Sequence, residues 1–238
     1  MNEFTSGYLI LKRDEEKVRQ SPPPKLVYPP NERGRALTND LYGKLPAETP
    51  HFFIKTLNEK WSVLLIDDTG GATTESKRGL DQWILESSKQ FPLLHFETHD
   101  DGFDYHLFSG GIEEASLEMN IAIEFSMRVD LVEQRYPDIE DPYIFFDGNP
   151  EINEALRLEV ENSAEYQTRV AQQYQHKNIA AFEVFNVPLQ VIAELEQLLS
   201  VESYFADRLG QVEKFKDILG FPEMSWVSYH YESRDLRE

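Results

Sequence analysis

The chain has 238 residues, with 23 Lys and Arg against 43 Asp and Glu, no Cys, and a formal net charge of −20. The lack of cysteine excludes disulfides, zinc–thiolate sites and thiol nucleophiles, and makes the cytoplasm the expected location. Nucleic acids and anionic membranes would be repelled, no apolar run approaches the ~20 residues of a membrane span, and no signal peptide is predicted.

The charge is unevenly distributed along the chain. Residues 1–50 carry a net charge of +1, whereas residues 51–238 hold 15 Lys and Arg against 36 Asp and Glu, a net charge of −21. Such an excess either keeps a protein soluble or forms an electrostatic docking face for a basic partner. Charge alone leaves both interpretations open.

The first 49 residues contain one predicted strand, Gly7 to Lys12, and the proline-rich stretch SPPPKLVYPP at 21–30. Proline fixes φ and supplies no amide donor, so this stretch is expected to be an extended connector on the surface. We therefore predict an N-terminal strand and proline-rich surface segment at 1–49, followed by a single α+β domain at 50–238.

Alternating and apolar runs predict most of the strands between residues 51 and 129. We expect strands at 51–56, 61–67, 93–98 and 103–108, a helix that Thr73 or Thr74 caps and Pro92 ends, and a hairpin at Gly110-Gly111. Apolar residues then recur at every second position from 117 to 129, which predicts a long half-buried strand. This pattern favours an antiparallel sheet.

The second half of the chain changes to helical periodicity after the turn-rich segment 136–150. We expect one helix from about 156 to 177, a short strand at 181–187, helices at 189–199 and 205–219, and a last strand at 226–231. Gly220 and Pro222 are a typical helix stop. The predicted fold class is α+β, a mainly antiparallel sheet flanked by helices, with C-terminal helices and a final short strand.

One hypothesis is a metal-dependent hydrolase. Asp67 and Asp68 leave an apolar strand just before a helix, a position where many α/β enzymes hold a metal ion. A second set of ligand types, His95, His99 and Asp101, follows within a short distance along the chain. Against this, Asp68 begins a polar turn, and the spacing matches no known metal motif.

Other enzymatic signatures are missing from the sequence. It contains no G-x-S-x-G nucleophile turn, no phosphate-binding P-loop and no dinucleotide-binding glycine motif. We therefore assign no catalytic residue and expect no cofactor.

The remaining candidate is the acid-rich segment 133–165, which holds ten Asp and Glu against Arg135 and Arg157. Aromatic residues are interleaved with these acids, and aromatic anchors inside a charged rim are typical of a steered protein interface. The alternative is that the aromatics are core and the acids face solvent. The interface hypothesis predicts that Asp141, Tyr143 and Phe145 contact the partner. Glu140 and Asp147 are the predicted steering charges.

Our preferred functional hypothesis is a non-enzymatic acidic protein that binds and neutralises a basic protein partner. Small acidic immunity proteins, antitoxins and inhibitors act in this way, and the comparison rests on charge alone. The metal-dependent hydrolase is one alternative. A structural subunit of a homo- or hetero-oligomer is the other.

Overall fold

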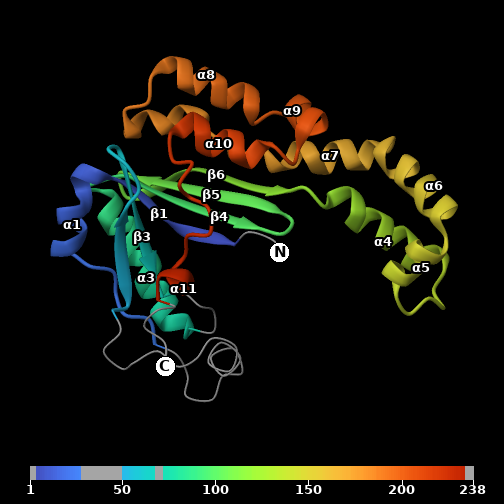
Figure 1. Cartoon of the computed structure of the whole chain (residues 1–238), viewed down its shortest axis with the longest axis horizontal. Helices are drawn as coiled ribbons and strands as arrows, with labels where there is room; N and C mark the ends of the chain where they lie inside the picture. The colour runs from blue at the N-terminus through green and yellow to red at the C-terminus, as the bar shows by residue number, and fades with distance from the viewer. Residues whose placement is uncertain (1–3, 28–49, 68–71, 234–238) are drawn as a thin grey trace.

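A six-stranded antiparallel sheet forms the centre of the protein (Figure 1). The computed structural model describes residues 4–27, 50–67 and 72–233. The strands lie in the order β2-β3-β1-β4-β5-β6, and each neighbouring pair is antiparallel, which confirms the α+β class and the predicted sheet. The strand bounds are β1 Thr5–Leu11, β2 Phe52–Thr56, β3 Trp61–Ile66, β4 Leu93–His99, β5 Gly102–Ser109 and β6 Ile112–Asn120.

Helices surround this sheet and make up most of the second half of the chain (Figure 1). Their bounds are η1 Lys12–Asp14, α1 Glu15–Gln20, α3 Thr74–Ser88, α4 Ile123–Arg135, α5 Pro142–Gly148, α6 Pro150–Glu161, α7 Ala164–Gln173, η2 Ile179–Phe185, α8 Leu189–Leu198, α9 Val201–Asp207, α10 Gln211–Leu219 and α11 Tyr229–Glu232, where η marks a 3-10 helix.

The N-terminal strand β1 lies in the middle of the sheet. Tyr8 pairs with Leu64 of β3 on one side and with His95 of β4 on the other. β1 is thus hydrogen-bonded on both edges to strands from beyond residue 50. The division of the chain at residues 49 and 50 stays a prediction.

The larger core lies between one face of the sheet and the C-terminal helices, and Figure 1 shows α8 and α10 running across that face. Alternate residues of each strand point into this core because a strand has a period of two. Phe96 and Tyr105 pack against Phe215 of α10 with ring centroids 5.9 and 5.4 Å apart. Trp61 donates an indole hydrogen bond to the carbonyl of Leu219 over 2.9 Å, which fixes the end of α10 to β3.

A smaller core covers part of the opposite face. Val18 of α1 and Ile84 of α3 pack there with Ile10 and Leu64, and Leu26 of the proline-rich stretch joins them. The start of α3 is capped as predicted, because the Thr73 hydroxyl accepts a hydrogen bond from the amide of Ser76. The last residues of the proline-rich stretch, 28–30, lie outside the described residues.

Two further turn predictions are confirmed. Gly110 and Gly111 connect β5 to β6 with φ angles of 64° and 91°, a conformation that favours glycine. Gly220 ends α10 with a φ of 77°.

Five predicted elements are wrong. The helix expected at 205–219 is divided into α9 and α10, with a turn at 208–210. The strand expected at 117–129 ends at Asn120, and α4 begins at Ile123. The helix expected from 156 to 177 is divided into α6 and α7, because Ser163 caps the start of the second helix by accepting a hydrogen bond from the amide of Tyr166.

The other two errors replace short strands with helical turns. Residues 181–187 lie largely in η2, where Phe182 and Phe185 reach the core at a spacing of three residues. Residues 226–231 form a loop and the start of α11, which Ser228 caps, so the final strand is absent. Within the described residues, none of the helices combines the length and the hydropathy that crossing a bilayer requires.

Candidate functional site

Helices α4, α5 and α6 form an arm, residues 123–161, that projects from the end of the sheet (Figure 1). Proline shapes each of its turns: Pro137 follows the end of α4, and Pro142 and Pro150 occupy the first positions of α5 and α6. Proline is favoured at a helix start, where its missing amide has no intrahelical partner. Asp141 caps α5, because its carboxylate accepts hydrogen bonds from the backbone amides of Tyr143 and Ile144 at 2.8 and 3.3 Å.

The arm has its own apolar cluster, centred on Val132, Phe146 and Leu156. The guanidinium of Arg128 in α4 contacts two neighbouring rings, those of Phe125 and Phe146, at 5.1 and 5.2 Å from their centroids. These contacts join the three helices.

Arg128 also forms a buried ion pair. Its guanidinium meets the carboxylate of Glu124 at 2.5 Å, with the side chains 11% and 6% exposed, and it donates a hydrogen bond to Asn153 of α6. A buried charge requires such partners. The partners of this buried charge therefore all belong to the arm.

The structure places the five predicted interface residues together around α5, but in different roles. Tyr143 is 64% exposed, and Glu140 and Asp147 are exposed beside it. Phe145 is half-buried against Tyr136, with ring centroids 5.0 Å apart, so it supports the arm. Asp141 serves as the helix cap described above.

One exposed residue was missed by the sequence analysis. Ile144 is 71% exposed beside Tyr143. The segment was interpreted as turns, whereas in the helix α5 residue 144 points to the side opposite Phe146 and is left in solvent. The signal was the Asp141-Pro142 pair, a typical cap followed by a typical first helical residue.

Nine of the ten acids of segment 133–165 separate into two groups, and the tenth, Glu133, lies on α4. Those on α6 and α7 are mostly paired: Arg135 with Glu159, Arg157 with Glu154 and Glu161, and Arg169 with Glu165. Hydrogen bonds from Arg157 and Arg135 hold the pKa values of Glu154 and Glu159 below the usual value. These carboxylates are engaged within the chain.

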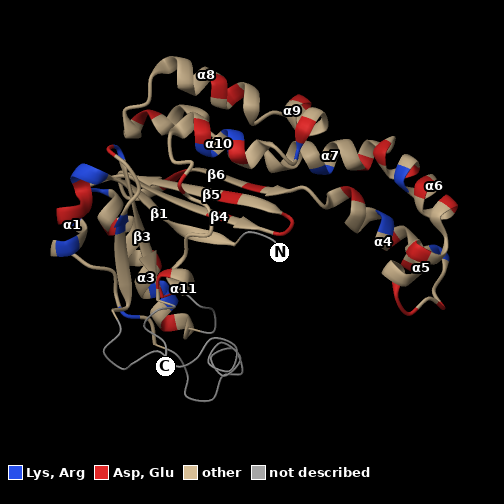
Figure 2. Ribbon diagram, in the orientation of Figure 1, with Lys and Arg blue, Asp and Glu red and all other residues tan. Residues whose placement is uncertain are grey.

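The second group lies at the distal end of the arm, residues 136–151, which we call the tip. The tip contains five acids and no Lys or Arg. One of these acids, Asp141, caps α5. The other four have no ion-pair partner among the described residues: Asp138, Glu140, Asp147 and Glu151. Figure 2 shows acidic residues on the loop before α5 and at α5 itself.

The residues of the metal hypothesis lie elsewhere and apart. β1 separates β3 from β4, so Asp67 at the end of β3 is about 10 Å from β4, two strand spacings away. Asp68 lies outside the described residues. Among the residues that are described, no three His, Asp or Glu side chains converge as metal ligands would.

His95 and His99 of β4 lie on the sheet face opposite the larger core, because they alternate with Phe96 of that core. Burial and the neighbouring imidazole of His106 lower the pKa of His95 to about 4. His99 approaches Asp104 at 3.5 Å, while burial raises the pKa of Asp104 despite that contact. These groups pair with one another across β4 and β5.

Fold and site together define an α+β protein with an antiparallel sheet and a projecting helical arm whose tip is acidic. Comparison with known proteins finds no matching family model, curated protein or solved structure.

Proposed function

We propose that this protein is a non-enzymatic interaction protein that binds a basic protein partner through the tip of its arm and thereby neutralises it. The supporting observation is the combination at the tip of unpaired carboxylates with two adjacent, exposed apolar side chains, Tyr143 and Ile144. In such an interface the apolar anchors supply affinity, and the charged rim steers the partner into place.

The charge of the whole chain supports the same proposal. A net charge of −20 raises the rate at which a basic protein meets this surface, and this effect weakens with salt. The partner surface that fits is rich in Lys and Arg around an apolar depression that accepts Tyr143. The rigid arm core lowers the entropic cost of presenting that side chain.

The experiment is affinity capture from the source cells, followed by titration of the captured protein after purification. The charge variant combines Asp138→Asn, Glu140→Gln and Asp147→Asn. The matched control combines Glu183→Gln, Glu202→Gln and Asp217→Asn, which are exposed acids of the helices beside the sheet and change the net charge equally. We expect at least tenfold weaker binding for the tip variant and a smaller change for the control.

A second pair of variants tests the apolar anchors. Tyr143→Ser with Ile144→Ser is compared with Leu189→Ser with Ile112→Ser, which removes two exposed side chains elsewhere. The tip pair should lose about 2 kcal/mol of binding free energy or more. The proposal is rejected if no basic protein is recovered in a salt-sensitive manner, or if tip and control variants bind it equally well.

A further inference from the structure

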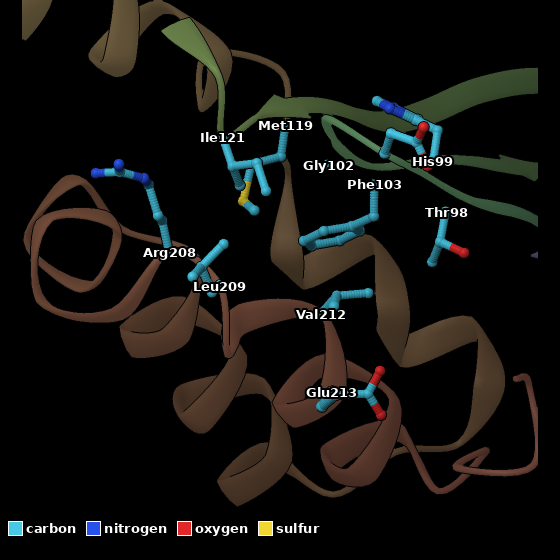
Figure 3. A pocket seen from close by; sticks show the side chains of 11 residues that line it. Thr98, His99, Gly102, Phe103, Met119, Ile121, Arg208, Leu209, Val212 and Glu213 are labelled. Atoms are coloured by element: carbon cyan, nitrogen blue, oxygen red, sulfur yellow. The ribbon is translucent and has the colours of Figure 1, made fainter. Parts of the chain in front are cut away.

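A cleft of about 290 Å³ opens beside the root of the arm. It is formed by the β4–β5 turn, the end of β6, the loop between α9 and α10, and the first turn of α10 (Figure 3). Ile121, which lines the cleft, lies two residues before α4. No residue of the acidic tip takes part in it.

The middle of the cleft is apolar. Phe103, Met119 and Val212 line it, and Leu209 stands at its edge with 70% of its surface exposed. Ligand pockets of globular proteins usually enclose roughly 300 to 1,000 Å³, so this cleft is at the small end of that range. It suits one ring or a short aliphatic chain.

Arg208 supplies a positive charge at one end. Its guanidinium lies 6.0 Å from the ring centroid of Tyr204, and it has no carboxylate partner among the described residues. The carboxylates nearest in sequence are engaged elsewhere, Asp207 by Lys214 at 2.8 Å and Glu213 by Lys216 at 2.7 Å. In a chain with this excess of acids, a guanidinium left without a carboxylate at a cleft favours an external anion.

The opposite end of the cleft is polar. Figure 3 shows Arg208 and Thr98 on either side of the ring of Phe103. Thr98 is buried, and its hydroxyl oxygen finds no hydrogen-bond partner in the described part of the chain.

We propose that this cleft binds a small monocarboxylate with an apolar body. The carboxylate pairs with Arg208, and the body lies over Phe103, Met119 and Val212. The proposal is independent of partner binding at the tip.

The test uses 3-phenylpropionate as the probe and 3-phenylpropan-1-ol as its neutral counterpart, each titrated into the full chain and followed by amide NMR shifts. We expect shifts confined to residues 98–103, 119–121 and 208–213, and about tenfold tighter binding of the acid. Arg208→Gln should remove the preference for the acid. Arg78→Gln should preserve it, since Arg78 is an exposed arginine of α3 that also has no ion pair in the described residues.

A second variant addresses the position of the site without disturbing the core. Leu209→Glu places a carboxylate at the edge of the cleft and should weaken binding of the acid at least tenfold, whereas Leu189→Glu, at an equally exposed position of α8, should leave it unchanged. The proposal is overturned if the probe causes no shifts at millimolar concentration or if the shifts map elsewhere. It is also overturned if Arg208→Gln prefers the acid over the alcohol as strongly as the wild type does.

Discussion

The guanidinium of Arg128 lies over the ring of Phe146, 5.2 Å from its centroid, and so joins α4 to α5. The same guanidinium neutralises Glu124, which is buried. We predict that Arg128→Met lowers the free energy of unfolding by about 3 kcal/mol, because it leaves that carboxylate buried without a partner. Urea unfolding monitored by circular dichroism measures the loss.

The double variant Glu124→Leu with Arg128→Met separates the cost of an unpaired buried carboxylate from the cost of losing the Arg128 side chain. It removes both charges and keeps apolar volume, so it should be more stable than Arg128→Met alone. A single variant that unfolds at the wild-type urea concentration would show that this pair does not hold the arm together.

Asp141 and Glu140 are adjacent acids with different roles. We predict that Asp141→Ala raises the hydrogen-exchange rates of the α5 amides about fivefold, which corresponds to about 1 kcal/mol for a lost helix cap. Asp141→Asn should keep the rates within about twofold of wild type, because asparagine also caps helices. Glu140→Gln is the neutral comparison, and equal effects of Asp141→Ala and Asp141→Asn would contradict the capping role.

The error at α4 has a physical cause that the sequence pattern conceals. Ile123 and Met127 face the main core, whereas Phe125 and Val129 face the arm cluster. Residues two apart in a helix point to nearly opposite sides, so a helix packed on both sides repeats apolar residues at every second position. Periodicity predicts such a segment as a strand unless the second core is known.

Elements with a strong local signal were predicted well. In β5, Phe103, Tyr105 and Leu107 alternate with polar residues, and Thr73 and Gly220 mark helix ends by local chemistry. The acidic tip is contiguous in sequence and was therefore accessible. The cleft could not be predicted, because Thr98, Met119 and Arg208 come from separate segments that only the tertiary fold brings together.

Two glycines should respond in opposite directions to alanine. Gly79 lies within α3 with no atom within 4 Å of an added Cβ, so Gly79→Ala should stabilise the protein by about 0.5 to 1 kcal/mol. Gly102 has a φ of 154°, and its added Cβ would lie 1.7 Å from the carbonyl oxygen of Met119. Gly102→Ala should lower the melting temperature and Gly79→Ala should raise it, and a shift of the same sign in both would refute this account of the β4–β5 turn.

The lowered pKa of His95 predicts how the free energy of unfolding depends on pH. Its pKa is about 4 in the folded protein against 6.5 for an unperturbed histidine, so between these values the unfolded chain binds the proton more tightly. The contribution of His95 is therefore fully present above pH 6.5 and is lost as the pH falls from 6.5 towards 4, by about 2 kcal/mol between pH 7 and pH 5.

The variant His95→Gln isolates this contribution, because Asp104, His106 and the other titrating groups remain in both proteins. Urea unfolding at pH 7 and pH 5 should show a loss about 2 kcal/mol smaller for His95→Gln than for wild type. Any effect of the substitution on the free energy of unfolding that does not depend on pH is the same at pH 7 and pH 5, so it cancels when the two losses are compared. Equal losses in the two proteins would mean that His95 accepts its proton in the folded state as readily as in the unfolded chain, contrary to its position against Tyr8 and His106 on the sheet.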